Sequence, residues 1–245
     1  VSELHGGNGS DFLYSNGGRS SDGVIEKLFG EQGNDRLRAN QPGNAGPAYL
    51  DGGEGDDWVY GTPQDDRIIY NSGIKEVWGY EGDDLFVTSS RGRGRFDGGS
   101  GRDTISFAAH TPSERQGSIS GVKVDLAAGS ALGFSNYDLK GIEDVIGSAF
   151  DDRITGAPGT ANAINAGLGN DQITAQSEDA VDGGLGENVC TGGNQTNCND
   201  SSPGNQRGEI TQVDITEGGL PIIMGSDDDD SITVGYDSAA GGFQG

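Results

Sequence analysis

One short pattern recurs along most of this chain and limits the folds that the chain can form. A glycine is followed by two variable residues, usually a second glycine, one variable residue, an aspartate, one more residue and a large apolar residue. The clearest copies are GGNGSDFLY from Gly6, GEQGNDRLR from Gly30, GGEGDDWVY from Gly52, GYEGDDLFV from Gly79 and GGSGRDTIS from Gly98. Because such a unit can bury its apolar side only against its neighbours, the repetition predicts a solenoid.

Weaker copies lie between the clear ones and extend the pattern toward the end of the chain. They are GGRSSDGVI at Gly17, GTPQDDRII at Gly61, GSAFDDRIT at Gly147, GLGNDQIT at Gly167, GGLGENVCT at Gly183 and GSDDDDSIT at Gly225. The copies at Gly61 and Gly147 lack the second glycine, and Asn188 stands where an aspartate is expected.

This pattern resembles the RTX (repeats-in-toxin) calcium-binding nonapeptide family, and the likeness covers most of the chain between Gly6 and Cys190. The resemblance implies a parallel β-helix whose turns bind calcium ions, which adjacent turns share. It implies ligand roles for the aspartates of the matched turns, with turn carbonyl groups completing each shell.

The chemistry of the unit agrees with that implication. Glycine supplies the positive φ that a tight turn needs and allows a close approach of backbones. Turn carbonyls together with an aspartate carboxylate are hard oxygen ligands, and Ca²⁺ accepts six to eight of these in a flexible geometry, whereas Mg²⁺ demands a tighter octahedron. We therefore expect several Ca²⁺ ions as the cofactor. The candidate ligands are Asp11, Asp22, Asp35, Asp57, Asp66, Asp84, Asp103, Asp152, Asp171, Asn188 and Asp230, in turns formed by Gly6, Gly30, Gly33, Gly52, Gly55, Gly79, Gly82, Gly98, Gly101, Gly147, Gly167 and Gly169.

The spacing of the aspartates predicts the architecture. Asp66, Asp84 and Asp103 lie 18 and 19 residues apart, which is the length of one coil made of two strands and two turns. Asp57 and Asp66 are nine residues apart and should lie on opposite edges. The fold class is therefore all-β, a flattened right-handed parallel β-roll, with ions first along one edge and later mainly along the other. Strand alternation turns the second residue after each aspartate inward, namely Leu13, Leu37, Val59, Ile68, Phe86, Ile105, Ile154 and Ile173.

The organisation along the chain follows from where the repeat stops. We expect a β-roll over residues 1–107, an irregular coil or hairpin insertion over 108–146, a second block of repeats over 147–200, and a linker with a further β or RTX-like segment over 201–245. The acidic run Asp227–Asp230 is either one more calcium turn or a solvated stretch, and the following Ser-Ile-Thr-Val favours the turn. Thr88–Gly94 is expected to be a plain turn, and Arg91, Arg93 and Arg95 to lie in an exposed loop.

The charge of the chain excludes some partners. Aspartate and glutamate number 39 against 15 lysines and arginines, which gives a net charge of −24. A field of this sign repels nucleic acid and anionic lipid and attracts cations. An acidic chain that is only 31% hydrophobic could be disordered, unless something outside the chain neutralises it.

The two cysteines indicate the redox environment. Cys190 and Cys198 close a short polar loop, CTGGNQTNC. They could be free thiols, but the spacing and the loop composition favour a disulfide and hence an oxidising compartment.

No catalytic residues are expected. His5 and His110 have no metal-like spacing and are each predicted to lie at the surface, and no Ser-His-Asp set, GxSxG, HExxH or P-loop is present. An aspartate pair could serve a glycosidase, but an active site is needed once, whereas a structural ligand is needed in every coil. The expected function is a calcium-binding structural module of a secreted or cell-surface bacterial protein that folds on Ca²⁺ outside the cell. The alternatives are a secretion or stability domain of a larger RTX adhesin, toxin or hydrolase, and a β-helix polysaccharide lyase or epimerase.

The expected partners are calcium and either copies of this chain or neighbouring domains. A parallel roll ends in open strand edges and an exposed apolar layer. Neither the five residues ahead of Gly6 nor the glycine-rich end of the chain offers a cap. The sequence therefore predicts contacts at both ends, which would build a fibre, matrix or surface layer if the partner is another copy.

Overall fold

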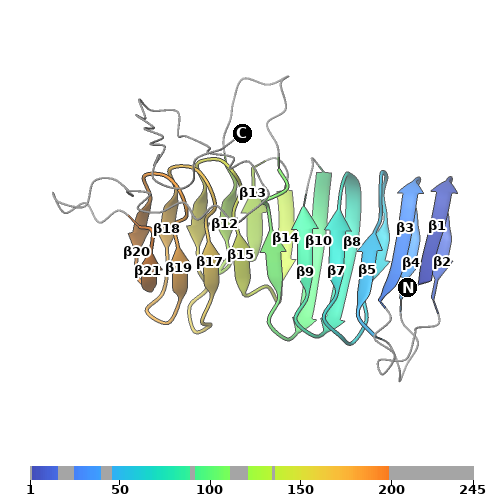
Figure 1. The fold of residues 1–245 in the computed structure, drawn as a ribbon, viewed down its shortest axis with the longest axis horizontal. Coiled ribbons are helices and arrows are strands. Elements are labelled where there is room, and N and C mark those ends of the chain that lie inside the picture. The colour runs from blue at the N-terminus through green and yellow to red at the C-terminus, as the bar shows by residue number, and fades with distance from the viewer. Residues whose placement is uncertain are drawn as a thin grey trace, which may run out of the picture. The chain divides into compact units, whose positions relative to one another are not determined.

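The architecture is seen in a computed structural model, which describes residues 2–15, 25–39, 46–88, 92–110, 121–133 and 136–198. All of the described residues belong to one compact unit of the chain, Val1–Gly208. They form two β-sheets whose strands stack side by side from β1 and β2 to β20 and β21 (Figure 1). Among these residues no helix is long and apolar enough to cross a membrane.

The chain alternates between the two sheets, so that each coil contributes a strand to both. The ten-stranded sheet contains, in spatial order, β1 (Ser2–Asn8), β3 (Glu26–Gln32), β5 (Ala48–Asp51), β7 (Arg67–Tyr70), β9 (Leu85–Thr88), β11 (Thr104–Ser106), β15 (Asp144–Ile146), β17 (Ala163–Asn165), β19 (Ala180–Asp182) and β21 (Asn194–Thr196). The eleven-stranded sheet contains β2 (Phe12–Tyr14), β4 (Arg36–Arg38), β6 (Trp58–Tyr60), β8 (Gly73–Glu81), β10 (Gly92–Ser100), β14 (Asn136–Lys140), β13 (Ser130–Leu132), β12 (Lys123–Asp125), β16 (Arg153–Thr155), β18 (Gln172–Thr174) and β20 (Val189–Thr191).

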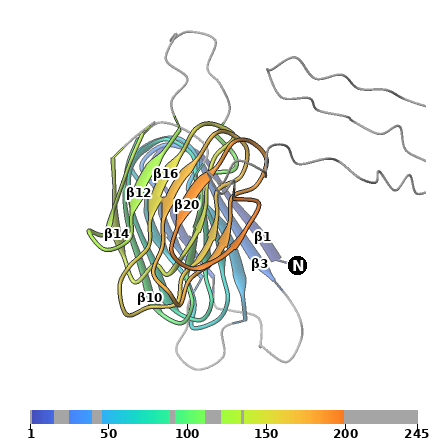
Figure 2. The same ribbon diagram turned by 90° about the vertical axis from the view of Figure 1, so that its left-hand side faces the viewer.

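Nearly all of the strand pairs are parallel, as in a roll. Viewed end-on, the successive coils lie over one another and the two sheets face each other (Figure 2). The predicted parallel β-roll is thus confirmed. Parallel strands of this kind need a connection that returns the chain to the same end of the sheet, and the strand of the opposite sheet with its two turns provides it.

A thin apolar core runs between the sheets and consists of one inward residue from each short strand. In the ten-stranded sheet Leu50, Ile68 and Phe86 follow one another in register, and all three are fully buried. The inward orientation predicted for the second residue after each aspartate is confirmed, because all eight of those residues are buried. Their neighbours point outward, as Phe12 shows with 77% of its surface exposed. One column of side chains per sheet therefore supplies most of the apolar burial.

The regular coils are interrupted between β11 and β15. Strands β12, β13 and β14 form antiparallel pairs with each other, while β14 pairs in parallel with β10 and β12 pairs in parallel with β16. They lie side by side between β10 and β16, where a regular coil would contribute one strand to the eleven-stranded sheet. This is the part of the chain where the sequence predicted an insertion. An aromatic cluster of Tyr70, Phe86, Phe96, Phe107 and Tyr137 packs where the insertion joins the regular coils.

Two expectations about polar residues in this region were wrong. His110 is buried rather than at the surface, since it packs beside Phe107 and its Nε2 lies 2.9 Å from the hydroxyl of Thr88. Arg93 and Arg95 are exposed but lie on strand β10 rather than in a loop. The strand pairs with β8 on one side and β14 on the other. A short motif does not reveal that pairing, because both partners are distant in sequence.

The two ends of the described roll differ. At the β1 and β2 end each sheet has a strand paired on one side only, and Leu4 and Phe12 are exposed there. At the other end the core column of the ten-stranded sheet finishes in the polar residue Gln195, which lies in register with Val181. The expected disulfide is confirmed between Cys190 and Cys198, and Cys190 occupies the core position next to Ile173.

Candidate metal centre

Aspartates line the first edge of the roll, which we define as the turns that lead into the eleven-stranded sheet. Asp11, Asp35 and Asp57 directly precede β2, β4 and β6, which are in register. The backbone N–H of Asp11 donates to Oδ1 of Asp35 at 2.8 Å, and that of Asp35 donates to Oδ1 of Asp57 at 2.9 Å. We call such a series, in which each carboxylate receives the backbone N–H of the preceding coil, an aspartate ladder.

The second edge, formed by the turns that lead into the ten-stranded sheet, carries its own ladder. Asp66 donates its N–H to Oδ1 of Asp84 at 2.8 Å, and Asp84 donates to Oδ1 of Asp103 at 2.9 Å. Asp57 and Asp66 therefore lie on opposite edges. Later in the chain the pattern returns to the first edge, where Asp152 donates to Oδ1 of Asp171 at 2.7 Å. The expectation that the later repeats lie mainly along the other edge was therefore wrong, because the strands of the insertion bring the chain back to the eleven-stranded sheet before β16.

Each ladder bond uses only one oxygen of the carboxylate, and the other oxygen is often left without a partner. The Oδ2 atoms of Asp11, Asp35, Asp84, Asp103 and Asp171 are buried and accept no hydrogen bond. A buried polar atom without a partner is costly. Burial raises the pKa of Asp84 to about 8, that of Asp171 to about 7 and that of Asp103 to about 6. The charged form of these side chains thus needs a cation beside it.

The glycines make the space in which oxygens of neighbouring turns converge. A Cβ atom added to Gly6 would lie 2.7 Å from the carbonyl oxygen of Gly30 in the next coil and 3.0 Å from Oδ2 of Asp11. The first glycine of the other turns has the same surroundings, an aspartate Oδ2 or a carbonyl of the next coil, at Gly30, Gly52, Gly79, Gly98 and Gly147. This donor set, a carboxylate with backbone carbonyls, fits the oxygen ligands that Ca²⁺ takes.

The second glycine of the turn has a steric role. Gly82 has a φ of 107°, and a Cβ on it would lie 2.5 Å from the backbone carbonyl carbon of Gln64 in the preceding coil. A side chain there would push the coils apart. The equivalent residues Gly33, Gly55, Gly101 and Gly169, and also Gly167, share the positive φ and the close backbone contact.

Within the described residues, the copies at Gly61 and Gly147, which lack a second glycine, use a different chemistry. Thr62 donates both its backbone N–H and its hydroxyl to the carboxylate of Asp66, at 2.5 and 2.9 Å. Ser148 does the same for Asp152, at 2.5 and 2.7 Å. Both carboxylates therefore have protein donors on both oxygens, unlike the five with an unpaired Oδ2.

Two other predicted ligands also have protein partners. The amide Nδ2 of Asn188 donates to the carbonyl of Asn197 at 3.1 Å, while its Oδ1 accepts the N–H of Asp171. The ammonium of Lys75 donates to Oδ2 of Asp57. The described predicted ligands thus fall into two groups. In the first group, Oδ2 of the carboxylate has no hydrogen-bond partner. In the second group, both terminal atoms of the side chain contact a protein group. Asp22 and Asp230 lie outside the described residues.

Sequence reasoning missed several members of the two edges. Glu143 follows Asp103 on the second edge and accepts its N–H at 3.0 Å, and Asp179 accepts the N–H of Asn162 at 2.8 Å. The insertion separates Glu143 from Asp103 by 40 residues, so no periodic signal marks it. Lys75 could have been found by counting one coil of 18 residues from Asp57.

Comparison with known families agrees with this chemistry. The family model of the RTX calcium-binding nonapeptide repeat matches in four copies, at residues 3–21, 42–74, 139–173 and 159–190. The chain carries RTX calcium-binding repeats. Such repeats bind Ca²⁺ at multiple sites and are typical of secreted bacterial proteins. A search of curated proteins finds no match.

The RTX turns of this chain differ from a site made of side chains. Within the described ranges no group of three or more His, Cys, Asp or Glu side chains gathers as a metal cluster. An RTX site needs no such cluster, because backbone carbonyls supply a large share of the oxygens. The ladders are therefore the candidate calcium sites of this structure.

Proposed function

We propose that this chain is a structural module of a secreted or cell-surface bacterial protein, which folds when it meets calcium outside the cell. The observation that carries the proposal is the series of buried Oδ2 atoms without partners on Asp11, Asp35, Asp84, Asp103 and Asp171. They recur coil after coil, as structural ligands do. A single catalytic centre would not need this repetition.

The charge balance supports coupling between calcium and folding. The chain carries a net charge of −24, and the roll stacks its aspartates in rows one coil apart. Without a cation, desolvation and repulsion oppose the folded state, while the core of one inward residue per strand contributes little to offset them. The free energy of ion binding then becomes free energy of folding. A low-calcium cytosol would keep the chain unfolded until export.

Circular dichroism tests this proposal directly. We expect a disordered spectrum in excess chelator and a β spectrum in millimolar Ca²⁺, with a matching decrease in hydrodynamic radius by size-exclusion chromatography. Sodium chloride at matched ionic strength is the control for non-specific screening. A β spectrum that is the same in chelator and in calcium would refute the proposal.

We further propose that the β1 and β2 end docks onto another set of coils, either of a second copy or of the same longer polypeptide. In support, both sheets present a strand paired on one side only at this end, and Leu4 is 39% exposed at the end of a core column. Open parallel edges and uncovered apolar side chains favour continued stacking. A head-to-tail contact of this kind does not close on itself, and copies would form a fibre or an array.

Light scattering during a calcium titration tests the stacking. We expect particle mass to grow once the roll has folded, and Leu4→Asp to reduce this growth by placing a charge at the end of the column. Leu132→Asp is the matched control, because Leu132 is 45% exposed but lies on the β12–β14 insertion. A folded protein that stays monomeric at high concentration would exclude polymerisation of this chain.

The outer face of the eleven-stranded sheet does not favour a lyase or epimerase. Arg95 lies between Glu76 on β8 and Asp138 on β14, which are its neighbours in register. Opposite charges on adjacent strands are an ordinary stabilising arrangement. We infer that these charged residues stabilise the sheet.

A further inference from the structure

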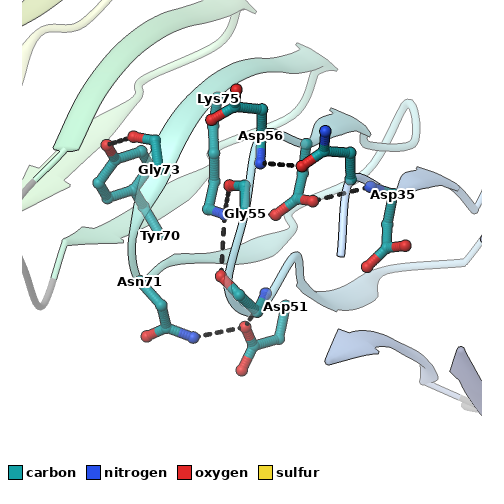
Figure 3. Close-up of polar contacts among 11 residues, drawn as sticks. Asp35, Asp51, Gly55, Asp56, Tyr70, Asn71, Gly73 and Lys75 are labelled. Atoms are coloured by element: carbon teal, nitrogen blue, oxygen red, sulfur yellow. Dashed lines mark hydrogen bonds and ion pairs between the residues drawn. The ribbon is translucent and has the colours of Figure 1, made fainter. Parts of the chain in front are cut away.

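One turn of the first edge already contains a cation that belongs to the protein. The ammonium of Lys75, on β8, donates to the carbonyl oxygens of Gly53 and Gly55 at 2.9 and 3.0 Å and to Oδ2 of Asp57. Figure 3 shows the side chain reaching from β8 to the turn that holds Gly55. The side chains of Lys75 and Asp57 are both completely buried.

The register places Lys75 in the aspartate ladder itself. Trp58 and Glu76 are partners in β6 and β8, so the residues that precede them, Asp57 and Lys75, occupy equivalent positions in successive coils. The series along this edge is therefore Asp11, Asp35, Asp57 and then Lys75. Asp35 has an unpaired Oδ2 beside the glycine of its own turn: a Cβ added to Gly30 would lie 2.5 Å from this oxygen and still closer to the carbonyl oxygen of Gly52 in the next coil. Oδ2 of Asp57 instead accepts a hydrogen bond from the ammonium of Lys75.

The contacts of Lys75 are of the kind that calcium would use. Its three partners are two turn carbonyls and one aspartate oxygen, and an ammonium group has three protons to donate. Every proton therefore has an acceptor. A buried ion pair is tolerated when its remaining hydrogen bonds are made, as they are here. Lys75 is a poor choice for an ordinary core position, which indicates that the charge itself is required there.

We propose that Lys75 replaces a calcium ion at the end of the first ladder, so that the Asp57 turn is closed without metal. The proposal rests on the calcium-binding function proposed above and adds which turn takes no ion. A single charge on the chain performs there the role that an external ion performs between Asp11, Asp35 and Asp57. The folding of the two coils that contain β6 and β8 then depends less on calcium than the folding of the coils before and after them.

Calcium stoichiometry, measured by isothermal titration calorimetry and by equilibrium dialysis, tests the proposal. Lys75→Asp puts a carboxylate in the ladder, and we expect it to bind one more calcium ion per chain than the native protein. Lys75→Met fills a similar space without charge or oxygen, and we expect no additional ion and a loss of stability that calcium does not restore. Lys140→Asp makes the same change of charge at an exposed residue whose ammonium pairs with Asp97, and should leave the stoichiometry unchanged.

Amine labelling of the native protein gives a second measurement that does not depend on how the variants fold. In the calcium-loaded protein we expect Lys75 to react at least about tenfold more slowly than Lys27, Lys123 and Lys140, because its nitrogen is inaccessible unless the roll opens. If rising calcium makes Lys75 reactive, the ion displaces the lysine and the proposal is overturned. The proposal also fails if Lys75→Asp folds and binds no additional ion. A native protein that binds no calcium at all would instead refute the proposed function.

Discussion

The aspartate of each turn contributes its two carboxylate oxygens to different contacts. In Asp84, Oδ1 accepts the backbone N–H of Asp66 and fixes the register of adjacent coils, while Oδ2 has no protein partner. The first contact needs only an acceptor, which an amide could provide. The second needs negative charge. A substitution that separates the two roles should therefore change calcium dependence without removing the ladder bond.

Asp84→Asn makes this separation. The amide oxygen can still accept the N–H of Asp66, but the charge that faces the next coil is lost. We expect the calcium concentration at the folding midpoint to rise about tenfold, which corresponds to about 1.4 kcal/mol of lost binding. Calcium titrations followed by circular dichroism measure it. Asp138→Asn is the control, since Asp138 is exposed on β14 outside the ladders, and equal midpoints for the two variants would show that Asp84 is no ligand.

His110 makes a separate contribution to the pH dependence of stability. Burial lowers the pKa of its imidazole to about 4, whereas the unfolded value is near 6.5. The folded state therefore favours the neutral ring, and the stabilising contribution is complete above pH 6.5 and is lost as the pH falls toward 4.

The variant His110→Gln should lack this part of the pH dependence. With calcium saturating at every pH, we expect the difference in unfolding free energy between the native protein and the variant to shrink as the pH falls from 6.5 to 4. Urea unfolding at a series of pH values measures the difference. A constant difference over that range would contradict the buried, neutral histidine.

At the scale of the element, the unit of stability is one coil, which contacts only the coil before it and the coil after it. Such a solenoid can lose its last coils while the others remain folded. The coil that ends in β20 and β21 has a neighbour on one side within the described roll, and its outermost strand carries Gln195 where the other coils carry an apolar residue. The disulfide links Cys190 on β20 to Cys198, which follows β21, and so ties together the two strands of this coil.

Replacing both cysteines with serine should therefore destabilise this end alone. Closing a loop of this length contributes about 2–3 kcal/mol by the loop-entropy estimate. We expect hydrogen exchange to quicken in β18 to β21 and to stay unchanged in β3 to β9. Uniform loss of protection along the whole roll would show that the coils unfold as one unit instead.

At the scale of the whole molecule, calcium and fixed protein groups share the task of balancing the acidic edges. Thr62 and Ser148 donate hydrogen bonds to Asp66 and Asp152, and Lys75 contributes a positive charge beside Asp57. The carboxylates with an unpaired oxygen depend on the ion. The fold therefore selects cations by size, because the distance between coils is set by the strand pairing and cannot shrink around a smaller cation.

Magnesium should therefore fail to replace calcium. Mg²⁺ requires oxygens at about 2.0–2.1 Å in a near-ideal octahedron and gives up its water reluctantly, whereas Ca²⁺ accepts 2.3–2.6 Å and variable geometry. At equal millimolar concentrations we expect a β spectrum with Ca²⁺ and a disordered spectrum with Mg²⁺. Folding in magnesium to the same extent would show that general neutralisation of charge is sufficient.

The repeat by itself determined the parallel roll, the inward column from Leu13 to Ile173 and the opposite placement of Asp57 and Asp66, and the spacing of the two cysteines favoured the disulfide. These features depend on strand alternation, coil length and local spacing, which a sequence shows directly. Tertiary structure alone decided which aspartates have partners. Lys75 reaches the first edge through strand register, and Glu143 reaches the second edge from beyond the non-repeating insertion. A buried oxygen is paired or unpaired according to what the adjacent coil places beside it, and no property of the residue itself reveals that neighbour.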